Sequence, residues 1–462
     1  MRGDQLGVLV PKRIVRRFTR LVLIVVCLFS FASVAAEVDK EGELTLSDAT
    51  FETANNSHEL KELKNQADAL SFKPLEFVSE YIPHLSVSGA HYLAAEYQFI
   101  NVNFSGNPFH FPSAFPQDYL SIDASWTIFD GFSAWHLYQS AKQQHAESNH
   151  QYANAEFQLG QRVRKSFYQA LAAEEMLKVT AQNVSTLKDH LTIASAMLRS
   201  GMSTRFDVLR LEAQLEEANA EYLLAVDNAS IARDELSQLM GLQLTDKRTL
   251  KGTLPIPDAR SIVENLKFSI EKREDIKAQR AHDESASYQN KASDGFWFPK
   301  VSLFAQEFFY KFGSFYPSII LPNPTIQNAY FVGVRVGWNV FDGGASIARS
   351  QSAGYQAKAQ QEALQKALVP LPFDFIKWKK RYLYYVILYK ARIRTVEKAK
   401  ESVRLAKIGL RAGVRTHTEV LDAETDWFRS NAQVIQSQLE AVETMIALEN
   451  TLGHYLTKDK SS

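Results

Sequence analysis

The chain has 462 residues and only one cysteine, so it can form neither an intrachain disulfide nor a four-cysteine zinc site. Its 20 glycines and 14 prolines are far too few for a collagen-like chain. The 52 basic residues balance the 52 acidic ones, which gives no electrostatic reason to expect nucleic-acid binding. A hydrophobic content of 45% is too high for a disordered chain.

Catalytic motifs are also missing. No G-x-S-x-G, H-E-x-x-H or phosphate-binding loop occurs. The 11 histidines show no paired metal-ligand spacing, and His145 and His150, five residues apart on a polar helix, are predicted to be solvated. We therefore expect no enzymatic activity, no metal and no cofactor.

The first 36 residues have the pattern of a secretory signal peptide. Basic residues precede an apolar run at 21–31, and the small residues Ala32, Ser33, Ala35 and Ala36 follow it. A membrane anchor is the alternative, but about 11 apolar residues are too few to cross a ~30 Å hydrocarbon core. The mature chain would contain no cysteine, since Cys27 lies in this run, and that suits an oxidising compartment.

The remainder of the chain contains an internal duplication. Residues 198–241 align without a gap on residues 410–453 at an offset of 212, and the same offset carries Trp126–Gly131 onto Trp338–Gly343. We predict a first structural repeat at 37–257, with an N-terminal helix, a β-hairpin at 85–129, an α-hairpin at 132–240 and a linker. The second repeat, 258–462, has a helix, a β-hairpin at 300–341, an α-hairpin at 345–453 and a short tail.

Each repeat contains two segments in which apolar and polar residues alternate. The segments are 85–100 with 120–128, and 301–312 with 330–341. Alternation gives a strand one apolar and one polar face. A soluble β-sandwich is the alternative, but four strands leave edges exposed and cannot close a barrel alone, so we favour a membrane β-barrel built from several subunits. Asp123 and Arg335, on the polar face, would line its lumen, and the links 101–117 and 313–328 would be outward loops with an interfacial girdle.

The helical parts are long and have a coiled-coil pattern. No proline occurs between Pro116 and Pro255, and apolar residues recur three and four apart on both sides of the turn at Ser200 and Gly201. An ordinary cytosolic coiled coil would not explain the signal peptide or the strands. Pro370 and Pro372 interrupt the second repeat, which indicates either a genuine helix break within 368–390 or a reading-frame error.

The stretch 408–423 resembles the turn between the two long helices of TolC-like outer-membrane efflux proteins, and the resemblance covers nearly all of the mature chain. It implies a homotrimer with four strands per protomer, whose 12-stranded barrel continues into a helical tunnel across the periplasm of a Gram-negative cell. It also implies a periplasmic adaptor and an inner-membrane transporter of RND, MFS or ABC type as partners, with outer-membrane lipid around the barrel.

The resemblance further implies two sets of functional residues. Asp207 and Arg415 match positions whose bonds keep the periplasmic aperture shut, and Glu419 and Asp422 match acidic rings at its mouth. The alternative is that Asp207 and Glu419 only suit a helix N-terminus. Leu410 departs from the pattern, since relatives can carry Tyr there. The adaptor-docking tips would comprise Leu198, Arg199, Gly201, Leu410, Arg411 and Gly413.

We therefore expect the outer-membrane channel of a tripartite efflux pump. The outer-membrane duct of a type I protein secretion system is the alternative, and a periplasmic coiled-coil structural protein is the third interpretation. A periplasmic adaptor would have only one long α-hairpin and would need further β-rich modules.

Overall fold

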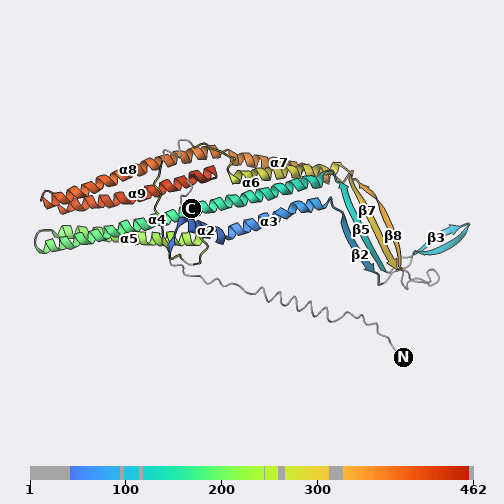
Figure 1. The fold of residues 1–462 in the computed structure, drawn as a ribbon, viewed down its shortest axis with the longest axis horizontal. Coiled ribbons are helices and arrows are strands. Elements are labelled where there is room, and N and C mark those ends of the chain that lie inside the picture. The colour runs from blue at the N-terminus through green and yellow to red at the C-terminus, as the bar shows by residue number, and fades with distance from the viewer. Residues whose placement is uncertain are drawn as a thin grey trace, which may run out of the picture. The chain divides into compact units, whose positions relative to one another are not determined.

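The computed structural model describes residues 42–93, 98–113, 118–243, 245–258, 266–311 and 326–456 (Figure 1). The chain divides into a small unit, Met1–Glu43 with Lys247–Thr249, and a large unit, Leu44–Asp246 with Leu250–Ser462. The predicted signal peptide and nearly all of the link 313–328 lie outside the described residues. Two short strands, β1 (Glu43–Leu44) and β6 (Thr249–Leu250), stand at the boundaries of the two units.

The large unit contains a four-stranded antiparallel sheet in the order β2–β5–β7–β8. Its strands are β2 (His84–His91), β5 (Asp118–Phe129), β7 (Lys300–Lys311) and β8 (Ile326–Gly337). Each of the four segments predicted to be extended overlaps one of these strands. Among the described strands, β2 and β8 each pair on one side only, so they are the edges of the sheet.

Two details of the strands differ from the expectation. The segment 85–100 does not form one strand, because β2 ends at His91 and a second strand, β3 (Gln98–Phe104), pairs with β4 (Asn107–Ser113) where a loop was expected. Ser105 and Gly106 connect them with φ of 48° and 88°, the left-handed values that a two-residue hairpin turn requires. Strand β8 begins at Ile326 and ends at Gly337, four residues before the predicted end.

The register gives the sheet two different faces. Residues paired across antiparallel strands point to the same side, so the pairs Val87–Ile122 and Leu303–Val334 lie on one face, which carries most of the aliphatic side chains of the sheet. The opposite face carries Ser86, Ser88, Ser121, Asp123, Gln306 and Arg335. The prediction that Asp123 and Arg335 lie on the polar face is in accord with this register.

Long helices make up most of the large unit outside the strands (Figure 1). The 67-residue α4 is about 100 Å long at 1.5 Å per residue. It forms one hairpin with α5, and α8 forms another with α9. The helices are α2 (Leu46–Asn56), α3 (His58–Ser79), α4 (Ser133–Arg199), α5 (Arg205–Leu239), α6 (Glu274–Ser293), the 3₁₀ turn η1 (Asp294–Trp297), α7 (Ala345–Leu368), α8 (Leu371–Arg411) and α9 (His417–Leu452).

The two hairpins pack together through their inner helices. α4 contacts both α5 and α9, and α8 contacts α9, which gives the order α5–α4–α9–α8 with α5 and α8 at the edges. Near the turns, α4, α5 and α9 bury Val184, Leu187, Leu211, Leu215, Ala218 and Leu421 in one cluster. Five of these six residues belong to the predicted coiled-coil seams.

The predicted interruption at the prolines is a short break between α7 and α8. α7 ends at Leu368 and α8 begins at Leu371, while Val369 and Pro370 keep helical dihedral angles. The helix that follows buries Leu371, Phe375, Tyr382, Val386 and Tyr389, which lie on one helical face. A frame-shifted sequence would not place large apolar residues at this spacing, so the packing favours a genuine break.

None of the helices in the described part of the chain is long and apolar enough to cross a membrane.

Candidate functional site at the hairpin tips

Both hairpins turn on a glycine in the left-handed region. Gly201 has φ of 75° and Gly413 has φ of 73°. Gly413 donates its N–H to the carbonyl of Leu410 and Val414 donates to Gly409, which closes the end of α8. A side chain at either position would be strained by this φ. The predicted turn glycines are therefore where the chain reverses.

A capping box starts the helix after each turn. Thr204 Oγ1 accepts from Asp207 N at 3.2 Å and donates to Asp207 Oδ2 at 2.6 Å, and Thr416 and Glu419 form the same motif on α9. Hydrogen bonds from Thr204 lower the pKa of Asp207 below its ordinary value. The backbone N–H of Thr416, with help from Arg415, lowers that of Glu419. Both carboxylates are thus ionised at neutral pH.

Charged pairs connect the remaining predicted gate residues. Arg415 lies against Gly409, where any Cβ would collide with it, and donates to Glu419 Oε1 at 2.7 Å. Asp422 accepts from Arg210 on α5 at 3.0 Å, so this pair joins the two hairpins. Within one protomer the side chains of Asp207 and Arg415 form hydrogen bonds to near neighbours in the sequence, Thr204 and Glu419.

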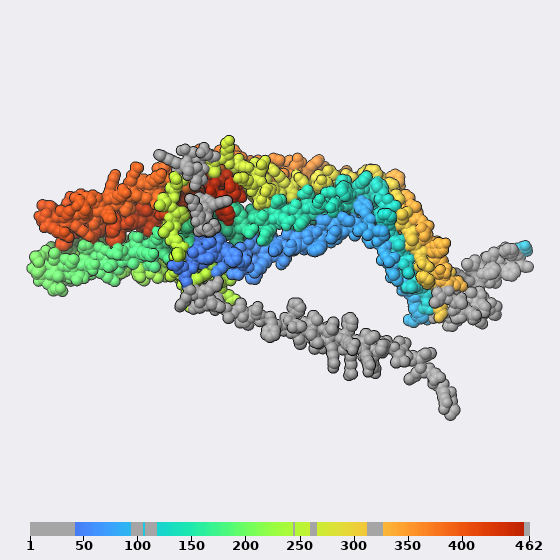
Figure 2. All heavy atoms as spheres, in the orientation of Figure 1, coloured from blue at the N-terminus to red at the C-terminus, as the bar shows by residue number. Residues whose placement is uncertain are grey.

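A cavity of about 380 Å³ lies between the tips, and Figure 2 shows both tips at the same end of the large unit. Asp207 and Arg415 both line it, so the fold brings the predicted latch residues to one cavity. Its wall also contains His190, Met197, Met202, Ser203, Arg210, Leu410 and His417. Of the predicted tip residues, Arg199, Gly201, Arg411 and Gly413 are exposed, while Leu198 and Leu410 are half-buried.

A buried carboxylate just behind the tips was missed by the sequence analysis. Glu424 on α9 is 4% exposed and lies 2.5 Å from His190 Nε2 of α4 and 2.6 Å from Lys407 Nζ of α8. Burial alone would raise the pKa of Glu424, but the bonds from His190 and Lys407 outweigh it and lower that pKa. Three helices are therefore tied to one charge.

Two other predicted positions have different surroundings. Asp123 accepts hydrogen bonds from Ser121 and Gln306, and Arg335 stacks over the ring of Phe304 at 4.9 Å, both on the sheet and not at the tips. The expectation that His150 is solvated is wrong, because α6 packs on α4 and places Glu274 Oε2 2.6 Å from His150 Nδ1. Among the described residues no cluster of His, Cys, Asp and Glu has the arrangement of a metal site.

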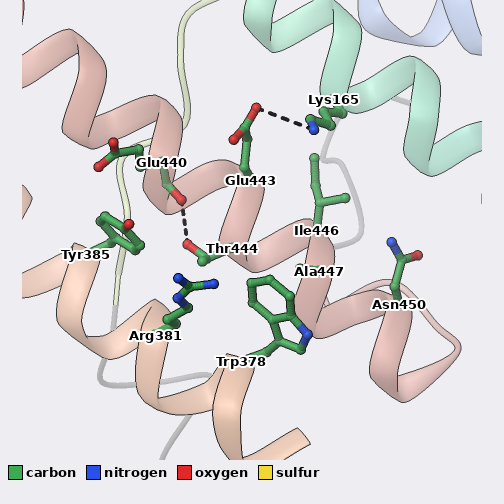
Figure 3. A pocket seen from close by; sticks show the side chains of 10 residues that line it. All are labelled: Lys165, Trp378, Arg381, Tyr385, Glu440, Glu443, Thr444, Ile446, Ala447 and Asn450. Atoms are coloured by element: carbon green, nitrogen blue, oxygen red, sulfur yellow. Dashed lines mark hydrogen bonds and ion pairs between the residues drawn. The ribbon is translucent and has the colours of Figure 1, made fainter. Parts of the chain in front are cut away.

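A second cavity, of about 350 Å³, lies between α4, α8 and α9 beyond the α7–α8 break (Figure 3). Trp378, Arg381 and Tyr385 of α8 line it together with Glu440 and Glu443 of α9, and Glu443 is directed toward Lys165. Lys165 of α4 lies 3.8 Å from Glu443, and Arg381 stacks on Trp378 at 5.4 Å. The cavity adjoins the break and contains one ion pair and one cation–π contact of its own, so we regard it as a packing feature of the break.

Comparison with known proteins shows similarity along most of the chain. The family model described as "Outer membrane efflux protein" matches residues 82–242 and 266–454. The chain is 22% identical over 337 residues to the "Proteases secretion protein PrtF" of Dickeya chrysanthemi, covering 70% of each protein. It is 23% identical over 359 residues to the "Outer membrane efflux protein BepC" of Brucella suis, covering 74% of this chain and 73% of that protein. Its fold matches the crystal structure of the outer membrane protein VceC from Vibrio cholerae with a TM-score of 0.70 at 16% identity, covering 89% of this chain and 97% of that one.

Proposed function

The chain belongs to the outer membrane efflux protein family, and we propose that it forms the passive exit duct of a tripartite efflux pump for small molecules. The protein lies in the outer membrane of a Gram-negative cell and extends into the periplasm. As a passive duct, it would enclose a path for the exported molecules and would catalyse no reaction.

The two-faced sheet is the observation that carries this proposal. Leu85, Val87, Val332, Val334 and Val336 on the apolar face are between 62% and 76% exposed. Such a face needs an apolar environment, which lipid provides. Exposed aromatic residues follow at the ends of the strands nearest the helices, as in the interfacial belts of membrane barrels: Trp126, Phe132, Trp135, Trp297, Phe298 and Trp338.

The free edges of the sheet support a trimer. β2 and β8 of one protomer have unpaired outer sides, so four strands from each of three copies would pair edge to edge into a closed barrel of 12 strands. Cyclic symmetry supplies each edge with the complementary edge of the next copy. The helices would then continue the barrel as a tunnel.

Helices α5 and α8, the edges of the helical layer, have complementary charge. α5 contains eight acidic and three basic residues, whereas α8 contains twelve basic and three acidic ones. In a closed ring, the α8 of one copy lies beside the α5 of the next, and opposite charges then face each other. Exposed apolar residues on both helices, among them Leu223 and Ile231 on α5 and Tyr384 and Ile387 on α8, would be covered in the same contact.

The tips then have two roles in this proposal. Asp207, Arg415, Glu419 and Asp422 form the constriction at the periplasmic mouth, and rings of three carboxylates would attract cations. The exposed turns with Arg199 and Arg411 receive the periplasmic adaptor, which connects the duct to an inner-membrane transporter.

Protein secretion is the second candidate, because two relatives are named as protease secretion proteins. A type I system would use the same duct with an ATP-driven exporter. The barrel, trimer and tips would be common to both, so cargo alone separates the two candidates.

Deletion of the gene tests the proposal. An efflux duct predicts a strain that is at least several-fold more susceptible to small toxic molecules, with an unchanged set of secreted proteins, and complementation restores resistance. A strain that loses a secreted protein but keeps its resistance would favour type I secretion. Envelope fractionation that finds the chain in the periplasm as a soluble monomer would refute both.

A further inference from the structure

The polar face of the sheet has a hollow near the strand ends away from the helices. Its volume is about 630 Å³, and its lining includes Tyr119, Ser121, Asp123, Phe308, Tyr310 and Phe331. The hollow is separate from the gate, the tips and the lipid-facing surface. Its shape follows from the register of the four strands.

Small residues form the floor and aromatic residues form the walls. Ser88 and Ser121 pair across β2 and β5, and their hydroxyl oxygens lie 3.0 Å apart. On the neighbouring strands, Phe308 and Phe331 pack edge to face with ring centroids 6.1 Å apart. Tyr92 and Tyr119, with centroids 6.3 Å apart, stand at the end of the hollow. On this face, the side chains of β2 and β5 at the floor of the hollow are therefore short, and those of β7 and β8 beside it are large.

A carboxylate without a cationic partner lies in this floor. Asp123 accepts hydrogen bonds from Ser121 Oγ at 2.5 Å and from the amide of Gln306, and both donors are neutral. Among the described residues no Lys, Arg or His forms an ion pair with it. Arg335 is on the same face, but it pairs with Ser302, four residues from Gln306 along β7, and it stacks on Phe304. That separation is about 13 Å at ~3.3 Å per residue.

We propose that this hollow binds organic cations that carry aromatic or alkyl groups as they leave through the barrel. The faces of aromatic rings attract cations, the Asp123 carboxylate supplies a full negative charge, and the apolar walls accept the organic groups. A small hydrated metal ion would gain little from such walls. The inference rests on the proposed function, because the hollow faces a lumen only when the sheet closes into a barrel.

Current block in planar bilayers tests the binding. We would reconstitute the purified full-length protein and add tetraphenylphosphonium on the side of the strand loops. The expected result is a saturable, concentration-dependent reduction of the current. Tetraphenylborate has the same size and shape with the opposite charge, and it should block at least tenfold more weakly. Equal block by the two ions would overturn the proposal.

Three variants locate the site. Asp123→Asn and Phe308→Leu should each weaken the block by about 3- to 10-fold, as expected for loss of a charge or of a cation–π contact in a partly exposed site. Glu307→Gln is the matched control, because Glu307 adjoins Gln306 and Phe308 on β7 but points to the opposite face, and it should leave the block unchanged. Migration as a trimer on unheated gels shows that each variant is assembled.

The outcomes separate this inference from the proposed function. Channels that conduct but are blocked equally in wild type and Asp123→Asn would overturn the inference and leave the duct intact. Assembled protein that never conducts would overturn the duct and the lumen site together.

Discussion

Glu424 connects three helices through a single side chain, and its removal should destabilise the region behind the tips. Glu424→Gln keeps the shape but leaves His190 and Lys407 without their shared anion. We expect a loss of about 1–3 kcal/mol in the free energy of unfolding, as for other buried hydrogen bonds to charged groups. Thermal unfolding of the detergent-solubilised protein at pH 7, followed by circular dichroism, measures it.

The duplicated sequence supplies the control for this variant. Glu212 stands at the equivalent position of the first repeat, 212 residues earlier, and is exposed. Glu212→Gln should change stability by less than about 0.5 kcal/mol, as for other surface substitutions. Equal stability of the two variants would show that the Glu424 cluster contributes nothing.

The same residue implies a pH dependence with a definite sign. The folded-state pKa of Glu424 is lowered from its ordinary value of 4.5, so its contribution to stability is present above that value and disappears as the pH falls through the folded pKa. The difference in unfolding temperature between wild type and Glu424→Gln should therefore shrink as the pH falls below about 4.5. A difference that has already vanished above pH 4.5 would contradict the lowered pKa.

Arg415 tests the proposed constriction at the level of one residue. Arg415→Ala removes the partner of Glu419 and the positive charge beside the carboxylates. Single-channel conductance in a planar bilayer should rise, because a latch is lost and the acidic mouth attracts cations more strongly. Arg411→Ala, which removes an exposed tip arginine, should leave conductance unchanged. Unchanged conductance in Arg415→Ala would show that Arg415 does not act as a latch.

At the scale of the element, the turn between α8 and α9 depends on the backbone of Gly413. Proline would fix φ near −65° and remove the N–H that bonds to Leu410. We expect Gly413→Pro to abolish crosslinking to the adaptor in cells while the trimer survives, because the change is confined to an exposed turn. Gly413→Asn should retain most of the crosslinking, since Asn tolerates left-handed φ. Full crosslinking of the proline variant would place the docking surface elsewhere.

The elements that sequence reasoning predicted are those encoded by local periodicity. The 3.5-residue repeat located α4 and α5, the internal duplication located α9, and strict alternation located β5 and β8. The β3–β4 ribbon was not predicted, although Ile100, Val102 and Phe104 alternate with asparagines over a short stretch before the turn at Ser105 and Gly106. Local patterns of this kind are weak evidence on their own.

Contacts between distant segments could not be predicted from local patterns. His190 and Glu424 are 234 residues apart, and no spacing in the chain relates them. Arg210 and Asp422 are different, because they occupy equivalent positions of the two repeats with opposite charge. That pair could have been found by comparing the charges of the repeats position by position.

At the scale of the whole molecule, the protomer has two kinds of incomplete edge. β2 and β8 leave backbone groups unpaired, while α5 and α8 leave apolar and oppositely charged side chains uncovered. The strand edges alone would pair with any exposed strand. The charges of α5 and α8 would reject self-pairing of either helix and favour one ring, in which each copy follows the next.

Exposed charges at matching heights allow this ring to be tested. Glu217 on α5 lies 16 residues after Gly201, and Lys398 on α8 lies 15 residues before Gly413. A rotational symmetry axis keeps these heights, so the two residues would meet between copies. Lys398→Glu places like charges at three equivalent contacts and should destabilise the trimer by about 0.5–1 kcal/mol per contact at low salt. The temperature at which the trimer dissociates should fall accordingly.

The reversed pair should restore what the single variant loses. Glu217→Lys combined with Lys398→Glu recreates opposite charges at each contact, so its trimer should dissociate near the wild-type temperature. The defect of the single variant should also diminish at 1 M salt, where the Debye length is about 3 Å. Glu217→Lys alone should show a defect of similar size. If the double variant instead shows the sum of the defects of Glu217→Lys and Lys398→Glu, then α5 and α8 of neighbouring copies are not adjacent at this height, and the ring closes through other faces.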